Sequence, residues 1–437
     1  MNSRPTLERL AAVVRHNRAF RRLFAANAVS QMGDWFNVVA LFSLLLDLTG
    51  KGEAVAVVLL ARFVPIFFVG PAAGVVADRI SRRAILVTTD VVRAALVLCL
   101  LFVRSPDQVW IAYAVMIAHA VCTAFFEPAQ QATVPNLVPA EDLVLAGTLE
   151  NSLWSATLAV GSSIAGMVLS TFGRDAAFVC DALSFVASAA LLRGLPAGRG
   201  AKALDAQARQ TAAEEQGPNA VSWVNLLGLA DLREGARYVA GHARVRALIV
   251  VKACFGLTLG GVLVLLAVFG ERVFTQGGGA GIATLWTARG VGSFLGPFVA
   301  FRLVGHDERG LRRGILWSFA TLVVCYCAFA ASPALWPAAA FLAAANAAGS
   351  TLWTYGSALL QRIVPDEVRG RVAAAEMAGM VLTMSSSTWA VGQSLDHGIA
   401  PRALMAACGL VALVPLAFWA SVQTAFHRAQ ARDRAAV

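Results

Sequence analysis

Long apolar runs dominate the sequence, and each is bounded by charged residues, Gly or Pro. A helix needs roughly 20 predominantly apolar residues to cross the hydrocarbon core of a bilayer. Twelve runs approach this length, so the pattern predicts twelve membrane-spanning helices. They cover 22–48, 54–77, 84–103, 108–131, 144–171, 175–195, 247–270, 279–301, 314–331, 334–361, 373–395 and 402–424.

The runs form two groups of six, separated by a polar stretch that cannot span. The two groups have nearly the same length, which is typical of a duplicated six-helix unit. The predicted fold class is an all-α integral membrane protein with two pseudo-symmetric six-helix bundles. The expected divisions are a cytoplasmic arm at 1–21, bundles at 22–195 and 247–424, a cytoplasmic linker at 196–246 and a cytoplasmic tail at 425–437.

Composition supports a membrane protein and gives its orientation. Of the 437 residues, 58% are hydrophobic and 14% are charged, whereas soluble domains carry about 25% charged residues. Most of the 36 Lys and Arg residues fall on one side of the predicted spans, together with both termini. Because positive loops stay in the cytoplasm, both termini are expected there. The net charge of +10 therefore follows from topology and does not indicate a nucleic-acid partner.

The linker contains one amphipathic segment. Between Trp223 and Tyr238, apolar and charged residues alternate at helical spacing, which predicts a cytoplasmic helix. Two interpretations remain open: the helix lies on the inner leaflet, or it is a solvated connector.

A motif at the turn between the second and third predicted spans has a specific resemblance. Residues 74–83 read Gly-Val-Val-Ala-Asp-Arg-Ile-Ser-Arg-Arg. This resembles the loop motif of the major facilitator superfamily, and it departs from that pattern at Ser81, where Gly is usual. The resemblance implies a latch that opens and closes during alternating access, although the arginines alone also fit a positive-inside anchor. The latch residues would be Gly74, Asp78, Arg79, Arg82 and Arg83.

Other segments make the resemblance narrower. Together they are similar to bacterial exporters that include enterobactin exporters and macrolide efflux proteins. The resemblance implies proton-driven export of a small hydrophobic, siderophore-like or drug molecule from the bacterial inner membrane. The Gly-Pro-x-x-Gly-Gly kink of drug antiporters is incomplete at 161–166. The segments are Gly33-Asp34, Asp90-x-x-Arg93, Glu127-Pro128-Ala129, Asp181-x-x-Ser184, Arg289-Gly290-Val-Gly292-x-x-x-Gly296-Pro297 and Val364-Pro365 to Arg371.

Ionisable residues inside the spans are costly, so each is a functional candidate, with structural pairing as the alternative. Asp34 lies near the middle of the first span without a cation within one helical turn, which makes it the first candidate for a protonatable carboxylate. Glu127, Glu150 and Asp181 are further candidates for proton coupling.

Four other charged residues are expected to be structural. Asp90 and Arg93 are three residues apart on one helix, which favours an internal ion pair. Lys252 lies near a helix end and is expected to reach the interface as an anchor. Glu376 is expected in the first turn of its helix, where the dipole favours an acid.

Polar and aromatic residues within the spans are candidates for a substrate cavity. Two arginines near mid-membrane would favour an anionic substrate, or they pair with buried acids such as Asp34 and Asp181. Aromatic rings could stack on a substrate, but packing explains any single one equally well. The predicted cavity residues are Gln31, Trp35, Arg62, Asn151, Arg289 and Trp353.

Other classes of protein fit the sequence less well. The six histidines are scattered, only His119 lies in a span, and no phosphate-binding loop occurs, so a membrane enzyme is disfavoured. A lipid or lysolipid transporter of the same fold remains an alternative. No cofactor or metal is expected, and the expected partners are a small-molecule substrate, protons and membrane lipids. The chain is expected to be a monomer.

Overall fold

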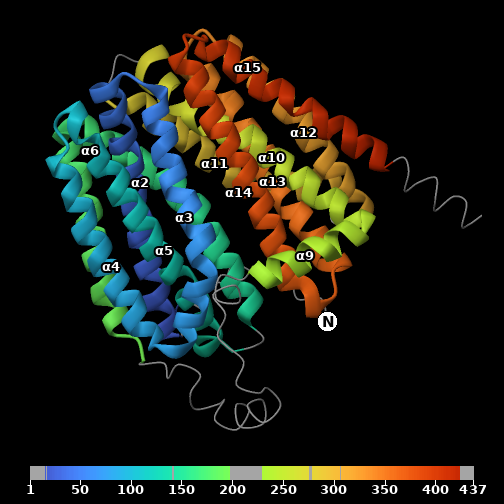
Figure 1. Ribbon diagram of the computed structural model, residues 1–437, viewed down its shortest axis with the longest axis horizontal. Coiled ribbons are helices and arrows are strands. Elements are labelled where there is room, and N and C mark those ends of the chain that lie inside the picture. The colour runs from blue at the N-terminus through green and yellow to red at the C-terminus, as the bar shows by residue number, and fades with distance from the viewer. Residues whose placement is uncertain are drawn as a thin grey trace, which may run out of the picture. The chain divides into compact units, whose positions relative to one another are not determined.

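The apolar runs form helices throughout the part of the chain that the structure covers. The computed structural model describes residue 15 and residues 17–139, 142–196, 229–274, 278–305 and 307–423. Long helices joined by short turns fill these ranges (Figure 1), as expected where backbone polar groups must be satisfied inside a bilayer.

The helices of the first half match the first six predicted spans closely. Their ends differ from the predicted ends by a few residues, in either direction. They are α2 (Arg18–Thr49), α3 (Gly52–Arg79), α4 (Arg82–Leu98), η1 (Cys99–Phe102), η2 (Pro106–Gln108), α5 (Val109–Leu137) and α6 (Leu143–Arg193).

One continuous helical segment contains both the fifth and the sixth predicted span. Within α6, Gly173 has a φ of +80°, a left-handed value that glycine adopts without a Cβ clash. This residue breaks the helical path between the two predicted spans. The predicted boundary at residues 172–174, between the spans 144–171 and 175–195, is therefore confirmed.

The second half matches the remaining six predicted spans, with one further helix before it. That helix, α9, overlaps the predicted amphipathic segment 223–238 and continues to Gly241; residues 223–228 fall outside the described part of the chain. The elements are α9 (Leu229–Gly241), α10 (Ala243–Val268), η5 (Phe269–Val273), α11 (Ala280–Val304), α12 (Glu308–Ala331), α13 (Leu335–Ile363), α14 (Asp366–Asp396) and α15 (Pro401–Val411), which is followed by further helix to residue 423.

Helix α9 contacts the beginning of α14. Arg371 donates from Nη1 to Oε1 of Glu234 at 2.7 Å. A Cβ on Gly235 would lie 2.7 Å from the carbonyl carbon of Arg371, so only glycine fits there. These contacts attach the predicted linker helix to a spanning helix.

Eight of the described helical segments are long and apolar enough to cross a membrane, with α6 counted as one. Helices α11, α13 and α14 are not among these eight, and their sequences contain Gly and Ser residues. Such residues are common where spanning helices pack against each other.

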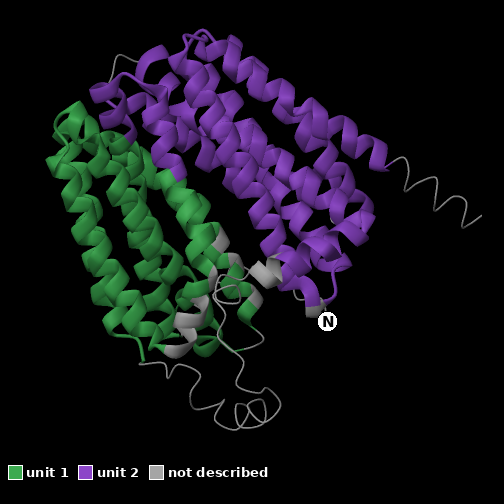
Figure 2. Cartoon of the chain, viewed as in Figure 1, with its two compact units in different colours: residues 1–41, 61–230 green, residues 42–60, 231–437 purple. Residues whose placement is uncertain are grey.

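Two compact units divide the chain (Figure 2). Unit 1 contains residues 1–41 and 61–230, and unit 2 contains residues 42–60 and 231–437. The end of α2 and the beginning of α3 thus belong to unit 2. The predicted division into bundles at 22–195 and 247–424 remains a prediction.

Each unit has its own apolar core. In unit 1, Leu23, Leu86, Phe126 and Leu192 meet in one buried cluster that joins α2, α4, α5 and α6. In unit 2, every residue of the segment 258–271 is buried, and α10 packs against α11, α13, α14 and α15.

Helices α11 and α13 approach each other along a stripe of glycine. A Cβ on Gly292 would lie 2.8 Å from the carbonyl carbon of Ala343, and one on Gly296 would lie 2.7 Å from that of Ala347. The spacing of four residues is the small-xxx-small pattern of close helix pairs in membranes. We call these four residues the glycine seam.

The glycine seam predicts a stability effect. Gly292→Ala would force a methyl group into the backbone of α13, so the helices must separate, and overpacking of this kind costs about 1–3 kcal/mol. We expect a lower thermal midpoint of the purified protein in detergent. Gly370→Ala on α14, where nothing lies within 4 Å of the added Cβ, is the control and should not lower it. Equal midpoints for both variants would contradict the close approach.

Candidate functional site

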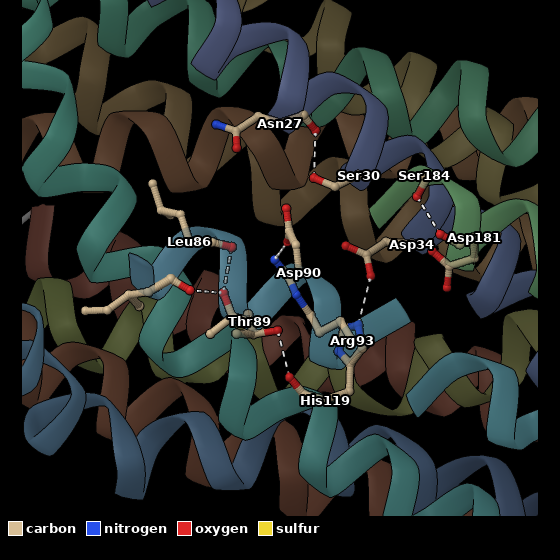
Figure 3. A network of polar contacts seen from close by, with 12 residues as sticks. Asn27, Ser30, Asp34, Leu86, Thr89, Asp90, Arg93, His119, Asp181 and Ser184 are labelled. Atoms are coloured by element: carbon tan, nitrogen blue, oxygen red, sulfur yellow. Dashed lines mark hydrogen bonds and ion pairs between the residues drawn. The ribbon is translucent and has the colours of Figure 1, made fainter. Parts of the chain in front are cut away.

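Polar side chains from four helices meet inside unit 1 (Figure 3). They come from α2, α4, α5 and α6, which are the four helices that the apolar core of unit 1 joins. We call this group the N-terminal polar cluster. Its members are Asp34, Asn37, Asp90, Arg93, His119, Asp181 and Ser184.

Asp34 on α2 faces a histidine on α5. Its Oδ1 lies 3.5 Å from Nε2 of His119, and the Asp34 side chain is 20% exposed while the imidazole is buried. A carboxylate and an imidazole at this separation can both take up a proton, and histidine is the side chain that titrates closest to neutral pH. His119 was not among the predicted site residues; the only signal in the sequence was that no other histidine lies within a predicted span.

Asp181 on α6 is fully buried. Asn37 donates from Nδ2 to its Oδ2 at 3.0 Å. Among the described residues, none donates to the other carboxyl oxygen, Oδ1. A buried polar atom without a partner is uncommon and often marks a working site.

The predicted ion pair on α4 is present. Arg93 Nη2 contacts Asp90 Oδ1, and both side chains are buried. The guanidinium also lies 4.3 Å from the ring centre of Phe126 and 4.5 Å from that of Phe185. Arg93 therefore joins α4 to α5 and α6 through cation–π contacts.

Two segments singled out in the sequence fit against each other. A Cβ on Gly33 would lie 2.7 Å from Oδ1 of Asp181 and 2.7 Å from Cβ of Ser184. Glycine at this position thus lets α6 bring its carboxyl group next to α2. Gly33-Asp34 and Asp181-x-x-Ser184 form one interface, although almost 150 residues separate them.

Other predicted residues of unit 1 lie along α6. Glu150 accepts through Oε2 from Asn27 and from Gln130, both at 3.0 Å. Gln31 accepts from Thr157 Oγ1 at 3.2 Å. The faces of α2 that carry Asn27 and Gln31 therefore contact α6, whereas Asp34 turns toward α5.

Further predicted residues of unit 1 differ in exposure. Trp35 is buried against Trp154, with ring centres 6.1 Å apart and an edge-to-face arrangement. Arg62 is half-buried and Glu127 is exposed. The side chain of Asn151 lies outside the described part of the structure.

The predicted latch is covered in part. The structure does not describe the surroundings of Gly74 or the side chains of Asp78 and Arg79. Arg82 donates to the carbonyl oxygen of Ala132 at 2.6 Å, and Arg83 donates to that of Leu195 at 3.1 Å. Both arginines therefore bind backbone carbonyls at the ends of α5 and α6.

The two charged residues expected to be structural in unit 2 lie elsewhere than predicted. The expectation that Lys252 reaches the interface is wrong, because its side chain is 1% exposed and forms an ion pair with Glu376. Glu376 is not in a first turn, since α14 begins ten residues earlier, at Asp366. The predicted cavity residue Trp353 lies beside this pair, with its ring centre 4.0 Å from the Lys252 nitrogen.

Arg289, the other predicted cavity arginine, is in unit 2 as well. Its guanidinium lies 4.9 Å from the ring centre of Trp286, and it is largely buried.

A buried acid that the sequence pattern does not mark is Glu271. Its side chain is 3% exposed and accepts from Ser43 Oγ at 2.8 Å and from the backbone of Gly279 at 3.1 Å. The next residue, Arg272, donates to the carbonyl oxygens of Leu46 and Gly50. These contacts attach the end of α2 to η5 within unit 2.

Comparison with known proteins identifies the family. A family profile of the major facilitator superfamily, described as "Transmembrane secretion effector", matches residues 11–436. The chain belongs to this family. This family belongs to the MFS transporters, which are not enzymes, and the chain is a multi-pass membrane protein.

Curated relatives within the superfamily are similar over part of their length. The uncharacterized MFS-type transporter YkuC of Bacillus subtilis is 30% identical over 254 residues, which are 57% of this chain and 56% of the relative. Macrolide efflux protein A of Streptococcus pyogenes is 30% identical over 169 residues, or 38% of this chain and 42% of that protein. The chain thus spans about half the length of the curated relatives it matches.

Solved structures establish the fold of this family member. A POT family transporter in complex with 5-aminolevulinic acid aligns with a TM-score of 0.67 at 12% identity, over 92% of this chain and 95% of that one. A bacterial homologue of the iron transporter ferroportin aligns with a TM-score of 0.66 at 15% identity, over 95% and 100%. The predicted major facilitator fold is confirmed.

The close contact of Gly33 with Ser184 can be tested by changing both residues and measuring thermal stability. Gly33→Ala should lower the thermal midpoint in detergent by the equivalent of about 1–3 kcal/mol, because the methyl group meets Ser184. Ser184→Gly in the same chain removes the obstructing atoms and should restore part of the loss, which gives a favourable coupling energy.

Gly147→Ala on α6, with nothing within 4 Å of the new Cβ, controls for the substitution itself. Strictly additive effects of the changes at positions 33 and 184 would show that these two residues are not in contact.

Proposed function

We propose that this transporter is a proton-coupled exporter of the bacterial inner membrane, with both termini in the cytoplasm. It moves a small hydrophobic, siderophore-like or drug molecule by alternating access of two halves, 22–195 and 247–424. The observation that carries the proposal is the meeting of Asp34 with His119 inside the N-terminal polar cluster.

The proton-carrying role rests on the cost of a buried charge. A carboxylate without compensation in an apolar interior is strongly unfavourable, so the group takes up a proton or finds a cation. Asp34 has both options, because His119 is close and the charges of Arg62 and Arg93 act on it. It can therefore be stable with and without a proton, which a carrier requires.

Asp181 and Glu150 extend the same chemistry along α6. Asp181 has one hydrogen-bonded carboxyl oxygen and one without a partner among the described residues, and a proton on the carboxyl group would remove the buried charge. Glu150 accepts two hydrogen bonds from amides. Asp34, Asp181 and Glu150 thus provide three proton sites within unit 1. Glu127 is a fourth acid in the same unit.

The direction of transport and the type of substrate rest on similarity. Macrolide efflux protein A matches part of the chain, which favours export of a drug-like molecule. Gln31, Trp35, Arg62, Asn151, Arg289 and Trp353 remain the proposed cavity residues, and residues 74, 78, 79, 82 and 83 remain the proposed latch.

The role of Asp34 is testable in proteoliposomes that contain a pH-sensitive dye. In the wild type we expect a macrolide or an enterobactin-like siderophore, presented separately, to drive proton movement. Asp34→Asn keeps the shape of the side chain but cannot ionise, so proton movement should fall to the rate of protein-free liposomes. Substrate counterflow, which needs no net proton movement, should persist in this variant.

Asp175→Asn is the matched control, because Asp175 forms an exposed ion pair with Arg104. It should leave proton movement unchanged. Coupled movement that survives in Asp34→Asn would transfer the role to Asp181 or Glu150. If neither compound moves protons in the wild type but a lysolipid does, the lipid transporter of the same fold replaces the proposal.

A further inference from the structure

A second charged site lies inside unit 2, apart from the N-terminal polar cluster. It surrounds the ammonium group of Lys252, which α10 places against α13 and α14. We call the three groups around that ammonium the ammonium cage. They are the carboxylate of Glu376, the hydroxyl of Ser357 and the indole ring of Trp353.

The cage surrounds the Lys252 nitrogen with three kinds of partner. Nζ forms an ion pair with Oε1 of Glu376 and donates to Oγ of Ser357 at 2.8 Å. The centre of the Trp353 ring lies 4.0 Å from the same nitrogen. A Cβ on Gly356 would lie 3.2 Å from Cδ of Lys252, so this glycine leaves room for the lysine stem.

These three partners are not specific to lysine. A carboxylate and the face of an indole ring attract alkylammonium ions in general, and a hydroxyl acceptor adds a hydrogen bond to those that carry an N–H. The Lys252 ammonium is therefore a tethered occupant of a site that suits an amine from outside. Among the described residues of the helices packed against α10, Glu376 supplies the only carboxylate paired with Lys252.

The walls of the cage are more accessible than its occupant. Lys252 is buried, whereas the side chain of Glu376 is 14% exposed, and Trp353 and Ser357 are half-buried. The carboxylate, the indole and the hydroxyl are therefore not fully enclosed by the protein.

We propose that the ammonium cage binds an organic cation of the alkylammonium class in exchange for the proton of Lys252. When the cation enters, an N–H bond of Lys252 breaks, the proton goes to water, and the neutral amine withdraws from Glu376. The cation then takes its place opposite the carboxylate. The cage has no net charge before or after the step, so no unpaired charge is left buried. This inference rests on the proposed function, because it supplies the export substrate's class and a proton that moves against it.

Lysine suits this exchange and arginine does not. Lysine can lose its proton in an apolar site, while a guanidinium stays charged at any physiological pH. A structural ion pair needs only a permanent positive charge opposite Glu376, which arginine also supplies. The substitution Lys252→Arg therefore separates exchange from structural pairing.

The test uses binding of benzyltributylammonium to the full-length protein in detergent and weak buffer. This cation has no dissociable proton, so any proton that appears comes from the protein. We expect the wild type to release about one proton for each cation bound. Lys252→Arg should lose both binding and release while it keeps its thermal midpoint, and Glu376→Gln should weaken binding at least about thirtyfold.

The controls distinguish this inference from the proposed function. Lys51→Arg, at an exposed lysine, and Asp175→Asn, at an exposed ion pair in the other unit, should both bind the cation and release the proton as the wild type does. Absence of binding by the wild type, binding without proton release, or wild-type behaviour of Lys252→Arg would each overturn the exchange. Loss of proton release in Asp34→Asn would also overturn it, because the proton would then come from the N-terminal polar cluster.

Discussion

Every charge that enters the apolar interior of this protein has to meet a partner, and the helix contacts follow from this requirement. Arg93 is paired with Asp90 on its own helix, and its guanidinium then brings aromatic rings of α5 and α6 together. Lys252 joins α10 to α14, and Asp34 joins α2 to α5. Polar contacts thus specify which helix faces meet, while the lipid-like interior alone would allow many arrangements.

The polar contacts depend in turn on small residues that let backbones approach. Gly33 admits the carboxyl group of Asp181, and Gly356 makes space for the stem of Lys252. Glycine is costly in an isolated helix, so its presence beside Asp181 and Lys252 indicates that close approach outweighs helix propensity there. The Asp181 carboxyl group in unit 1 and the Lys252 ammonium group in unit 2 both follow this principle.

The helices could be predicted from the sequence because length and composition decide where a chain can span a membrane. The break at Gly173 and the pair Asp90–Arg93 could also be predicted, because both depend on residues that are close together in the sequence. The partners of Asp34 and Lys252 could not be predicted, because an evenly apolar helix does not reveal which face turns inward. Lys252 appeared close to a helix end by residue count, whereas in the structure Glu376, more than 120 residues away, pairs with it. Glu271 was missed because it lies in η5, beyond the end of the predicted span.

The glycine seam has a mechanical consequence. Where Gly292 and Gly296 meet Ala343 and Ala347, backbone lies directly on backbone, with no layer of long side chains that could change rotamer and absorb a displacement. Packed interiors of this kind have low compressibility. Helices α11 and α13 are therefore expected to move together as one rigid pair. A displacement of α13 would also displace the part of α11 that carries Trp286 and Arg289.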